Sequence, residues 1–463
     1  MNTLSAAFEE RIKARLGEEA EAFFNALQTS SPVSIRLNPG KAASPESLFP
    51  EERIAGNVAW CHSGFYLSER PVFTLDPLFH GGAYYVQEAS SMFLHHILKQ
   101  LLPSTPVRML DLCAAPGGKS TLAASLLPPD SLLIANEVIR SRASILRENL
   151  IKWGTDNVVV TNNDPADFRP LTGAFDIIAV DAPCSGEGMF RKDPEAMREW
   201  SVGNLQLCSE RQQRILADIW DCLKPGGYLI YSTCTYNTGE NEAILEWLYR
   251  TYQATPVPIE HDFPGITPAY SDLPGYRFYP HKIPGEGFFT GVVRKTDGKE
   301  FNFRKNKKRE QAKPIALPDS LKPYLLRPDL YRPYADGNIL GIIPQAQADF
   351  IGGMEHTLRI LYKGCELAEC NNLKLKLLPP SALWQGLNRN YCSLYPADRD
   401  TALTFLKKED IPLAGNSGQW VLVTYRDIAL GWCKNLGNRM NNYYPKEWRI
   451  RMSLDTPGDR HKA

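Results

Sequence analysis

Long apolar runs and an excess of charge of one sign are both missing from this sequence. Its apolar stretches, of which residues 175–180 are typical, fall far short of the roughly 20 residues that span a bilayer. Lysine and arginine total 52, as do aspartate and glutamate, so any contact with nucleic acid must come from local basic patches. The N-terminal residues also lack the basic-then-apolar order of a secretory signal. We therefore expect a cytoplasmic protein without a membrane partner.

Cysteine is scarce, at 10 of 463 residues, which excludes a disulfide-stabilised scaffold and predicts free thiols in a reducing cytosol. Cys365 and Cys370 resemble half of a zinc site, but no matching second pair accompanies them. The pair His95 and His96 lies in a helical pattern, where histidines usually serve packing or the surface. We expect no bound metal.

The composition, with 43% hydrophobic and 22% charged residues, is that of a globular protein, and the length suffices for about three domains. Apolar residues at helical steps over 5–28 predict a helix, and the Pro- and Gly-punctuated runs over 31–82 predict short strands. Residues 297–313 contain seven basic residues against three acids, which fits either a solvated tether or an RNA contact. The expected domains are an accessory domain at 1–90, a catalytic domain at 91–296, a basic linker at 297–314, an intermediate domain at 315–400 and a final domain at 401–463.

From about Gln87 onward, short apolar runs alternate with helical segments, which predicts a parallel α/β sheet. An antiparallel pair at 276–278 and 288–293 is expected to follow. The expected parallel strands are 107–111, 132–136, 158–161, 176–181 and 228–232, and the expected helices are 119–127, 139–153, 204–223 and 240–250.

A Gly-rich turn follows the first of these strands and opens a helix, an arrangement typical of a cofactor pocket. A phosphate loop is excluded because Cys113 stands where that motif requires glycine. Glu137 ends the next strand, where an acid typically binds ribose hydroxyls, and Asp164 follows the third strand. The alternative is that these acids only cap helices. The turn consists of Cys113, Ala114, Ala115, Pro116, Gly117, Gly118 and Lys119.

Two cysteines follow the fourth and fifth strands. Cys184 lies in the segment Asp181-Ala-Pro-Cys, and Cys234 lies in Ser-Thr-Cys-Thr. A single buried cysteine is usually a small core residue. Two at adjacent strand ends, each in a polar turn, indicate instead that both thiols face one pocket, although the residues alone do not rank them.

These motifs, CAAPGGK, DAPCSGEG and STCT, resemble in order and spacing the signatures of the NOL1/NOP2/Sun family of RNA cytosine-C5 methyltransferases. The segments SIRLNP, YYVQEASSM and GWCKNLGNRMNNYYPKEWR extend the resemblance to the bacterial RsmF branch, which acts on 16S rRNA. The resemblance implies a class I, Rossmann-like methyltransferase core that uses S-adenosylmethionine. It also implies an N-terminal α+β accessory domain, a C-terminal PUA-like RNA-binding module, and a monomer that acts on 16S rRNA or the small ribosomal subunit.

The family's chemistry is covalent, because C5 of cytosine is too weak a nucleophile until a thiolate adds to C6. The resemblance implies that Cys234 is this nucleophile and that Cys184 assists loss of the C5 proton and release of the enzyme. DNA cytosine methyltransferases use a Pro-Cys thiol instead, so the ranking rests on the family. Asp181 would bind the N3 or N4 edge of the base. The implied cofactor-binding residues are 113–119, Glu137, Asp164 and Asp181.

Basic residues in two further segments are candidates for RNA contacts. Arg191 and Lys192 follow the Cys184 turn and would either meet phosphate or be solvated. The C-terminal segment interleaves Lys434, Arg439, Lys446, Arg449 and Arg451 with Tyr443, Tyr444 and Trp448, which fits RNA binding or a basic surface over buried aromatics. The other functions left open are methylation of tRNA, methylation of a protein or small molecule, and a non-catalytic role in ribosome assembly.

Overall fold

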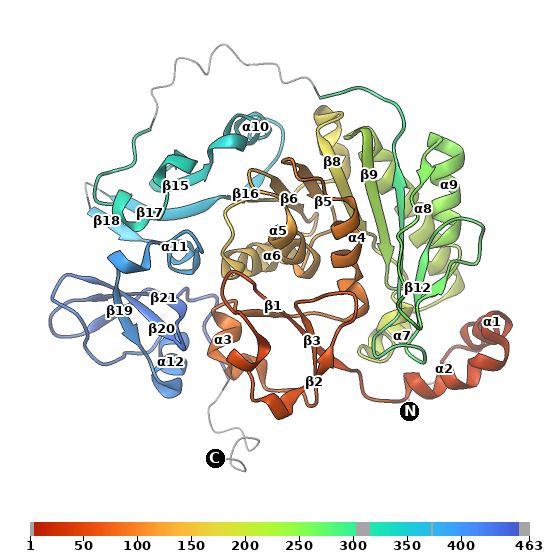
Figure 1. Ribbon diagram of the computed structural model, residues 1–463, viewed down its shortest axis with the longest axis horizontal. Coiled ribbons are helices and arrows are strands. Elements are labelled where there is room, and N and C mark those ends of the chain that lie inside the picture. The colour runs from red at the N-terminus through yellow and green to blue at the C-terminus, as the bar shows by residue number, and fades with distance from the viewer. Residues whose placement is uncertain (1–3, 302–314, 372–373, 453–463) are drawn as a thin grey trace.

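A computed structural model describes residues 4–301, 315–371 and 374–452, and its central feature is a mixed sheet (Figure 1). Its parallel part has the strand order β9-β8-β5-β6-β7, which confirms the expected parallel sheet. Every residue of β6 and β7 is buried, as expected of strands covered on both faces. These strands are β5 (Arg108–Asp111), β6 (Leu132–Asn136), β7 (Val158–Thr161), β8 (Phe175–Asp181) and β9 (Leu223–Thr233).

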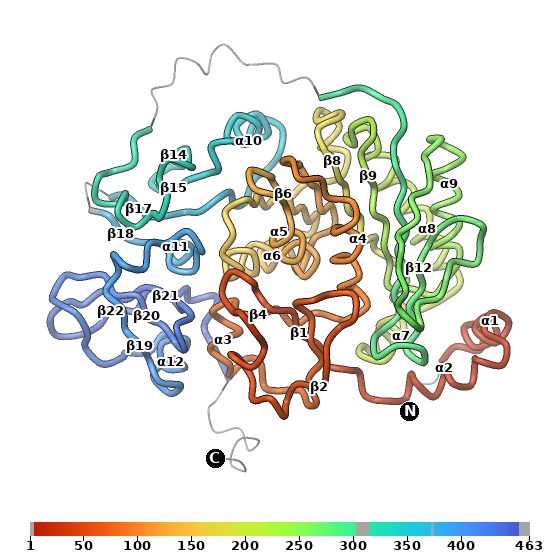
Figure 2. Tube along the Cα trace, in the orientation of Figure 1, coloured from red at the N-terminus to blue at the C-terminus, as the bar shows by residue number. Residues whose placement is uncertain are grey.

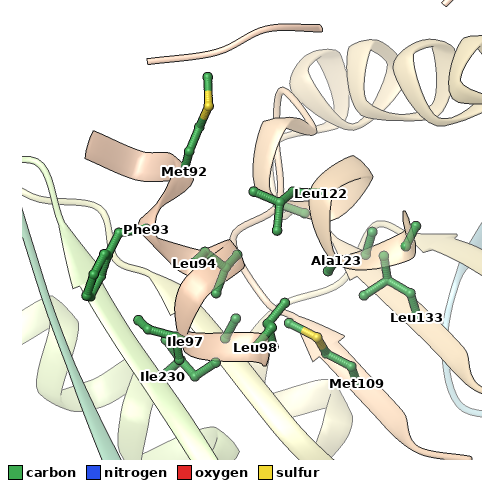
Figure 3. Packing of buried hydrophobic residues seen from close by; sticks show 14 of the residues in the cluster. Met92, Phe93, Leu94, Ile97, Leu98, Met109, Leu122, Ala123, Leu133 and Ile230 are labelled. Atoms are coloured by element: carbon green, nitrogen blue, oxygen red, sulfur yellow. The ribbon is translucent and has the colours of Figure 1, made fainter. Parts of the chain in front are cut away.

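Alternate residues of each parallel strand serve two separate cores, one on each face of the sheet. Met109 and Leu133 pack with α4, α5 and α6, whereas Leu110 and Ile134 pack with α8 and α9. Figure 3 shows the first core, in which Leu98 of α4 lies beside Met109 of β5, and Leu122 of α5 belongs to the same cluster. These helices are α4 (Phe93–Leu101), α5 (Gly118–Leu126), α6 (Arg140–Trp153), α8 (Val202–Trp220) and α9 (Glu242–Tyr252).

The sheet is extended by antiparallel strands at both edges. Beside β9 lie β13 (Phe288–Arg294) and β12 (Tyr276–Phe278), the expected antiparallel pair, with short strands β11 (Thr267–Pro268) and β10 (Thr255–Pro256). At the other edge, β16 (Ile360–Lys363) pairs with β7. The intermediate segment expected to form its own domain therefore supplies a strand to the catalytic sheet.

The N-terminal region forms two parts rather than one. The helix expected over 5–28 is divided into α1 (Ala6–Leu16) and α2 (Ala20–Leu27) at Gly17, whose φ of +55° suits glycine. These helices pack against Phe190 and Trp200 of the central domain. The second part is a sheet in the order β2-β3-β1-β4. Its elements are β1 (Val33–Leu37), β2 (Ile54–Asn57), β3 (Gly64–Leu67), β4 (Tyr84–Val86) and the helix α3 (Pro77–His80).

The C-terminal region contains two four-stranded sheets, in the orders β14-β15-β17-β18 and β19-β20-β21-β22. The expected boundary at residue 401 falls inside the second unit, because β19 precedes it and pairs in parallel with β20. The strands are β14 (Tyr331–Asp336), β15 (Ile339–Pro344), β17 (Cys365–Asn371), β18 (Lys374–Leu377), β19 (Ser393–Pro396), β20 (Trp420–Tyr425), β21 (Ile428–Asn435) and β22 (Met440–Asn442); the remaining helices are α7 (Pro194–Glu199), α10 (Ala348–Met354), α11 (Pro379–Leu383) and α12 (Arg399–Leu406).

Most of the basic linker expected at 297–314 lies outside the described residues, since the description stops at 301 and resumes at 315. Figure 2 shows that α1 and α2 lie at the opposite end of the molecule's long axis from the β19–β22 sheet. Within the described ranges, no helix is both long enough and apolar enough to cross a membrane.

Candidate active site

The predicted site residues gather at one edge of the central sheet. Asp111 and Asp181 end β5 and β8, while Glu137 and Asp164 follow β6 and β7. These are the carboxyl ends of neighbouring parallel strands. Strands β6 and β7 follow on one side of β5, whereas β8 and β9 follow on its other side, so the direction in which strands are added to the sheet reverses at β5. Open α/β sheets bind ligands at such a switch point.

The 113–119 turn is held in place by side chains from two other parts of the chain. Arg142 and Asn149 of α6 donate to the carbonyls of Ala115 and Pro116, at 2.9 and 2.8 Å. Arg36 of β1 donates to the Gly118 carbonyl at 3.2 Å and to Thr121 at 2.6 Å. The turn is thus braced before any ligand binds.

Arg36 is a positioning residue that the sequence analysis did not single out. Its guanidinium is buried, which lowers its pKa to about 10, and its Nε donates to Gln87 at 2.8 Å. Arg36 and Gln87 lie in the segments SIRLNP and YYVQEASSM, which carried the family resemblance. That resemblance was the available signal, because no local pattern links β1 to a turn some 80 residues later.

Asp111 is a buried carboxyl with one unused oxygen. Its Oδ2 accepts from Ser120 at 2.6 Å, whereas Oδ1 has no hydrogen-bond partner among the described residues. Burial, together with the nearby Asp181 and Glu137, raises the pKa of Asp111 to about 6. An unpaired buried polar atom is uncommon in proteins. A ligand with hydrogen-bond donors at this edge would satisfy it.

The raised pKa of Asp111 makes protein stability depend on pH. The folded protein retains this proton up to about pH 6, whereas the unfolded chain loses it near the ordinary pKa of 3.8. Rising pH across that window therefore lowers the free energy of unfolding, by about 3 kcal/mol in total. Asp111→Asn cannot titrate and can still accept from Ser120. Urea unfolding of the ligand-free protein should show this variant gaining stability relative to the parent between pH 4 and pH 7.

Asp329→Asn, at an exposed position, provides the control and should show no such relative gain. A constant stability difference between Asp111→Asn and the parent across that pH range would contradict the prediction.

Glu137 and Asp164 differ in how far local structure already uses them. Glu137 is buried; its Oε1 accepts from the Ile139 amide at 2.9 Å, and Arg142 lies 3.6 Å from its Oε2. Asp164 is partly exposed and caps the short 3-10 helix that follows it, accepting from the Ala166 amide at 3.1 Å. The capping alternative thus describes the local role of Asp164, and contact with a cofactor remains a prediction for both acids.

Asp181 is engaged at both carboxylate oxygens. Lys119 Nζ lies 2.7 Å from Oδ2, and Ser232 donates to Oδ1 at 2.8 Å. Burial opposes the charged form of Lys119, but the Asp181 carboxylate outweighs it and raises the pKa of this lysine. Lys119 thus contacts and orients Asp181, and its contact with a cofactor remains a prediction.

The two predicted thiols meet. Cys184 Sγ and Cys234 Sγ are 3.3 Å apart, at the ends of β8 and β9. The hydrogen bond to Cys234, reinforced by burial, raises the pKa of Cys184 well above its ordinary range. The two sulfurs are thus within hydrogen-bond distance, and either thiol can be the donor.

The loops carrying the thiols are fastened to each other. Gly188 N donates to the Cys234 carbonyl at 2.8 Å, and the hydroxyls of Ser185 and Thr235 are 2.9 Å apart. Glu240, whose pKa is raised by burial, accepts from Ser185 N at 2.9 Å. A side chain at Gly188 would collide with the Gly287 carbonyl. The spacing of the thiols is thus set by the packing of the two loops.

Some candidate RNA contacts are used internally. The side chain of Arg191 is buried and donates to Glu286 at 3.0 Å, with Lys192 3.5 Å from the same carboxylate. Arg191 is therefore neither a phosphate contact nor a solvated side chain. Tyr444 is also buried, packed against Phe405 at a ring-centroid distance of 5.5 Å, and cannot stack on a base. Of the five predicted C-terminal basic residues, Arg439, Lys446, Arg449 and Arg451 are exposed and Lys434 is partly buried.

A second connection that the sequence analysis missed joins the C-terminal region to the cofactor edge. The side chain of Asn163 donates to the Arg359 carbonyl at 3.1 Å and accepts from the Arg359 amide at 2.9 Å. Asn136 in turn donates to the carbonyls of Asn163 and Leu112, at 3.0 and 3.1 Å.

In the described parts of the chain, no group of three or more His, Cys, Asp or Glu could hold a metal ion.

Comparison with known families gives matches along most of the chain. Residues 99–294 match a family described as 16S rRNA methyltransferase RsmB/F. Residues 4–89 match the N-terminal domain of 16S rRNA methyltransferase RsmF, and residues 392–450 match the methyltransferase RsmF PUA domain. The last match begins just before β19, in keeping with the sheet to which that strand belongs.

Individual relatives agree with these matches. Ribosomal RNA small subunit methyltransferase F of Enterobacter sp. (strain 638) is 31% identical and covers 96% of this chain and 94% of its own length. The protein of that description from Cronobacter sakazakii is 33% identical over 84% of both chains. Among solved structures, a methyltransferase homolog from Pyrococcus horikoshii has a TM-score of 0.55 and 30% identity, covering 64% of this chain and 96% of its own. NSun6 from Pyrococcus horikoshii with SFG shares the fold, with a TM-score of 0.53, 21% identity, and coverage of 63% and 98%.

Proposed function

The chain belongs to the RsmF branch of the NOL1/NOP2/Sun RNA methyltransferases, and from this premise we propose that it methylates C5 of cytosine in 16S rRNA through a covalent thiol adduct. As a member of this family it is an RNA methyltransferase that uses S-adenosylmethionine. The observation that carries the proposal is the 3.3 Å separation of the Cys184 and Cys234 sulfurs beside the cofactor edge.

The residues present fit S-adenosylmethionine. Asp111 Oδ1 is buried and unpaired in the described structure, and the buried carboxylate of Glu137 stands where acids of this fold class bind ribose hydroxyls. We propose that the 113–119 turn, Glu137, Asp164 and Asp181 hold it. When bound, it supplies an electrophilic methyl group on a sulfonium.

Cys234 is proposed to begin the reaction by adding its sulfur to C6 of the cytosine. This addition displaces the electrons of the C5–C6 double bond, which makes C5 a nucleophilic enamine carbon. Asp181 is oriented by Lys119, and it favours proton uptake at the N3 and N4 edge of the base. After C5 has gained the methyl group it must lose its proton, so that the C5–C6 double bond re-forms and the Cys234 thiolate leaves. Cys184 is placed to assist this second half by accepting the C5 proton as a thiolate, because its sulfur lies 3.3 Å from the Cys234 sulfur that must leave.

The proposed partner is 16S rRNA within the small ribosomal subunit, bound by a monomer in the cytoplasm. The relatives named above are ribosomal RNA small subunit methyltransferases, the families that match residues 4–89 and 99–294 are described as 16S rRNA methyltransferases, and residues 392–450 match a PUA domain. Because the net charge of the chain is zero, contact with RNA phosphates requires a local group of positive charges. The exposed residues Arg439, Lys446 and Arg449 supply such charges in this region.

Bisulfite sequencing of total RNA tests the reaction and its substrate together. A 5-methylcytosine resists deamination, so we expect a cytosine of 16S rRNA to be protected in cells that make the protein and converted in cells that lack it. Protection should return with the parent gene and not with Cys234→Ala. A change confined to tRNA would replace the proposed substrate, and the absence of any change would favour the non-catalytic assembly factor.

A further inference from the structure

The helical pair α1–α2 touches both loops that carry the active-site thiols. Arg11 of α1 forms an ion pair with Glu187, three residues after Cys184. Arg15 donates to Thr238 Oγ1 at 3.3 Å, four residues after Cys234. From the loop side, Arg191 donates to the Ala26 carbonyl of α2 at 3.3 Å. The rest of the N-terminal region, in the β1–β4 sheet, takes no part in these contacts.

An apolar cluster holds the pair in this place. Phe8 packs against Phe190, with ring centroids 5.1 Å apart, and Phe23 packs edge-on against Tyr236 at 5.0 Å. Phe8 and Phe23 have no exposed surface. Phe190 belongs to the Cys184 loop and Tyr236 to the Cys234 loop, so the two helices cover both loops with one continuous core.

Glu187 is the junction through which these contacts reach the thiols. Its side chain is fully buried; Oε1 accepts from Trp200 Nε1 at 2.8 Å and Oε2 accepts from the Tyr236 amide at 3.0 Å. Both oxygens are therefore needed, one for each N–H donor, which an amide with one oxygen could not provide. A buried carboxylate also needs a cation, and α1 supplies Arg11.

We propose that α1–α2 is a structural part of the active site, in which Arg11 is a positioning residue. By neutralising Glu187, Arg11 lets that carboxylate hold the backbone beside Cys234, and so keeps Cys234 aligned with Cys184 and with the base. This proposal rests on the proposed covalent mechanism. It assigns to α1 an effect on the chemical step and not on the binding of RNA or cofactor.

Arg11→Met and Lys13→Met form a matched pair for the test. Both remove one positive charge from α1, but Lys13 is exposed and lies 3.5 Å from Glu9 of its own helix. The substrate is the small ribosomal subunit from cells lacking the protein, and the full-length enzyme is used. We expect Arg11→Met to lower kcat roughly 10- to 100-fold, the cost of misaligned reacting groups, with KM for subunits and for S-adenosylmethionine unchanged. Lys13→Met should match the parent, and Arg11→Lys should recover part of kcat.

Several results would overturn this proposal. The proposal is wrong if Arg11→Met has the same kcat as the parent enzyme. It is also wrong if Arg11→Met and Lys13→Met raise the KM for subunits equally, since α1 would then act by attracting RNA. If melting curves show that Arg11→Met does not fold, the exposed Arg15 decides, because Arg15→Met should lower kcat alone and a parent value would refute the proposal. Failure of the parent enzyme to methylate subunits at all would instead refute the proposed function.

Discussion

Cys234→Ala should yield neither methylated RNA nor a covalent complex with it. Without a thiolate to add at C6 the enamine cannot form, and the rate should fall roughly 10⁴-fold or more, as for other covalent nucleophiles. Cys184→Ala should still attack and methylate, but it should remain trapped on the RNA because loss of the C5 proton is impaired. The sulfurs are 3.3 Å apart, so each substitution removes one partner of the same contact. A denaturing gel with small ribosomal subunits and S-adenosylmethionine separates the two results, since only covalent adducts survive denaturation.

The control is Cys370→Ala, which removes a partly exposed thiol in β17 and should behave as the parent. A trapped complex with Cys234→Ala and none with Cys184→Ala would exchange the two roles. Adducts with neither variant, together with normal methylation by both, would exclude a covalent thiol mechanism.

Glu137→Ala should weaken binding of S-adenosylmethionine by about 2 kcal/mol, or roughly 30-fold in Kd, because charge-assisted hydrogen bonds to ribose hydroxyls are lost. The carboxylate is buried and already held by the Ile139 amide, so it is pre-oriented for such contacts. Calorimetric titration of the full-length protein measures the effect.

Glu137→Gln is the matched variant, since it keeps the shape and one acceptor oxygen and should lie between the parent and Glu137→Ala. Circular dichroism must show native structure in both. An unchanged Kd in Glu137→Ala would rule out the ribose assignment.

The structure also changes how a C-terminal role in RNA binding can be tested. Removing residues 315–463 would strip β16 from the edge of β7 and leave Asn163 without its partner Arg359. It would also expose Leu75, which packs in the core of the β19–β22 unit. A loss of activity on truncation would therefore report damage to the catalytic sheet as readily as lost RNA contacts, so substitutions at exposed residues such as Arg439 or Lys446 are more informative.

Local sequence determined the elements of the catalytic core and their order. The sequence predicts strands such as 132–136 and 158–161 because a strand that is buried on both faces requires a continuous run of apolar residues. Since parallel strands place their carboxyl ends at one edge, the meeting of Cys184 and Cys234 followed from their positions after adjacent strands. The sequence pattern does not predict that the helix divides at Gly17, because an isolated glycine does not by itself end a helical pattern.

Only the tertiary structure decided which distant segments support that edge. The contacts of Arg36 with Gly118, of Arg11 with Glu187 and of Asn163 with Arg359 join residues from 82 to 196 positions apart. It likewise decided that Arg191 pairs with the buried Glu286 and that Tyr444 is a core residue, where the sequence pattern allowed RNA contacts. The physical reason is that a pattern reports the periodicity of one segment, whereas burial and pairing depend on the surface that another segment presents.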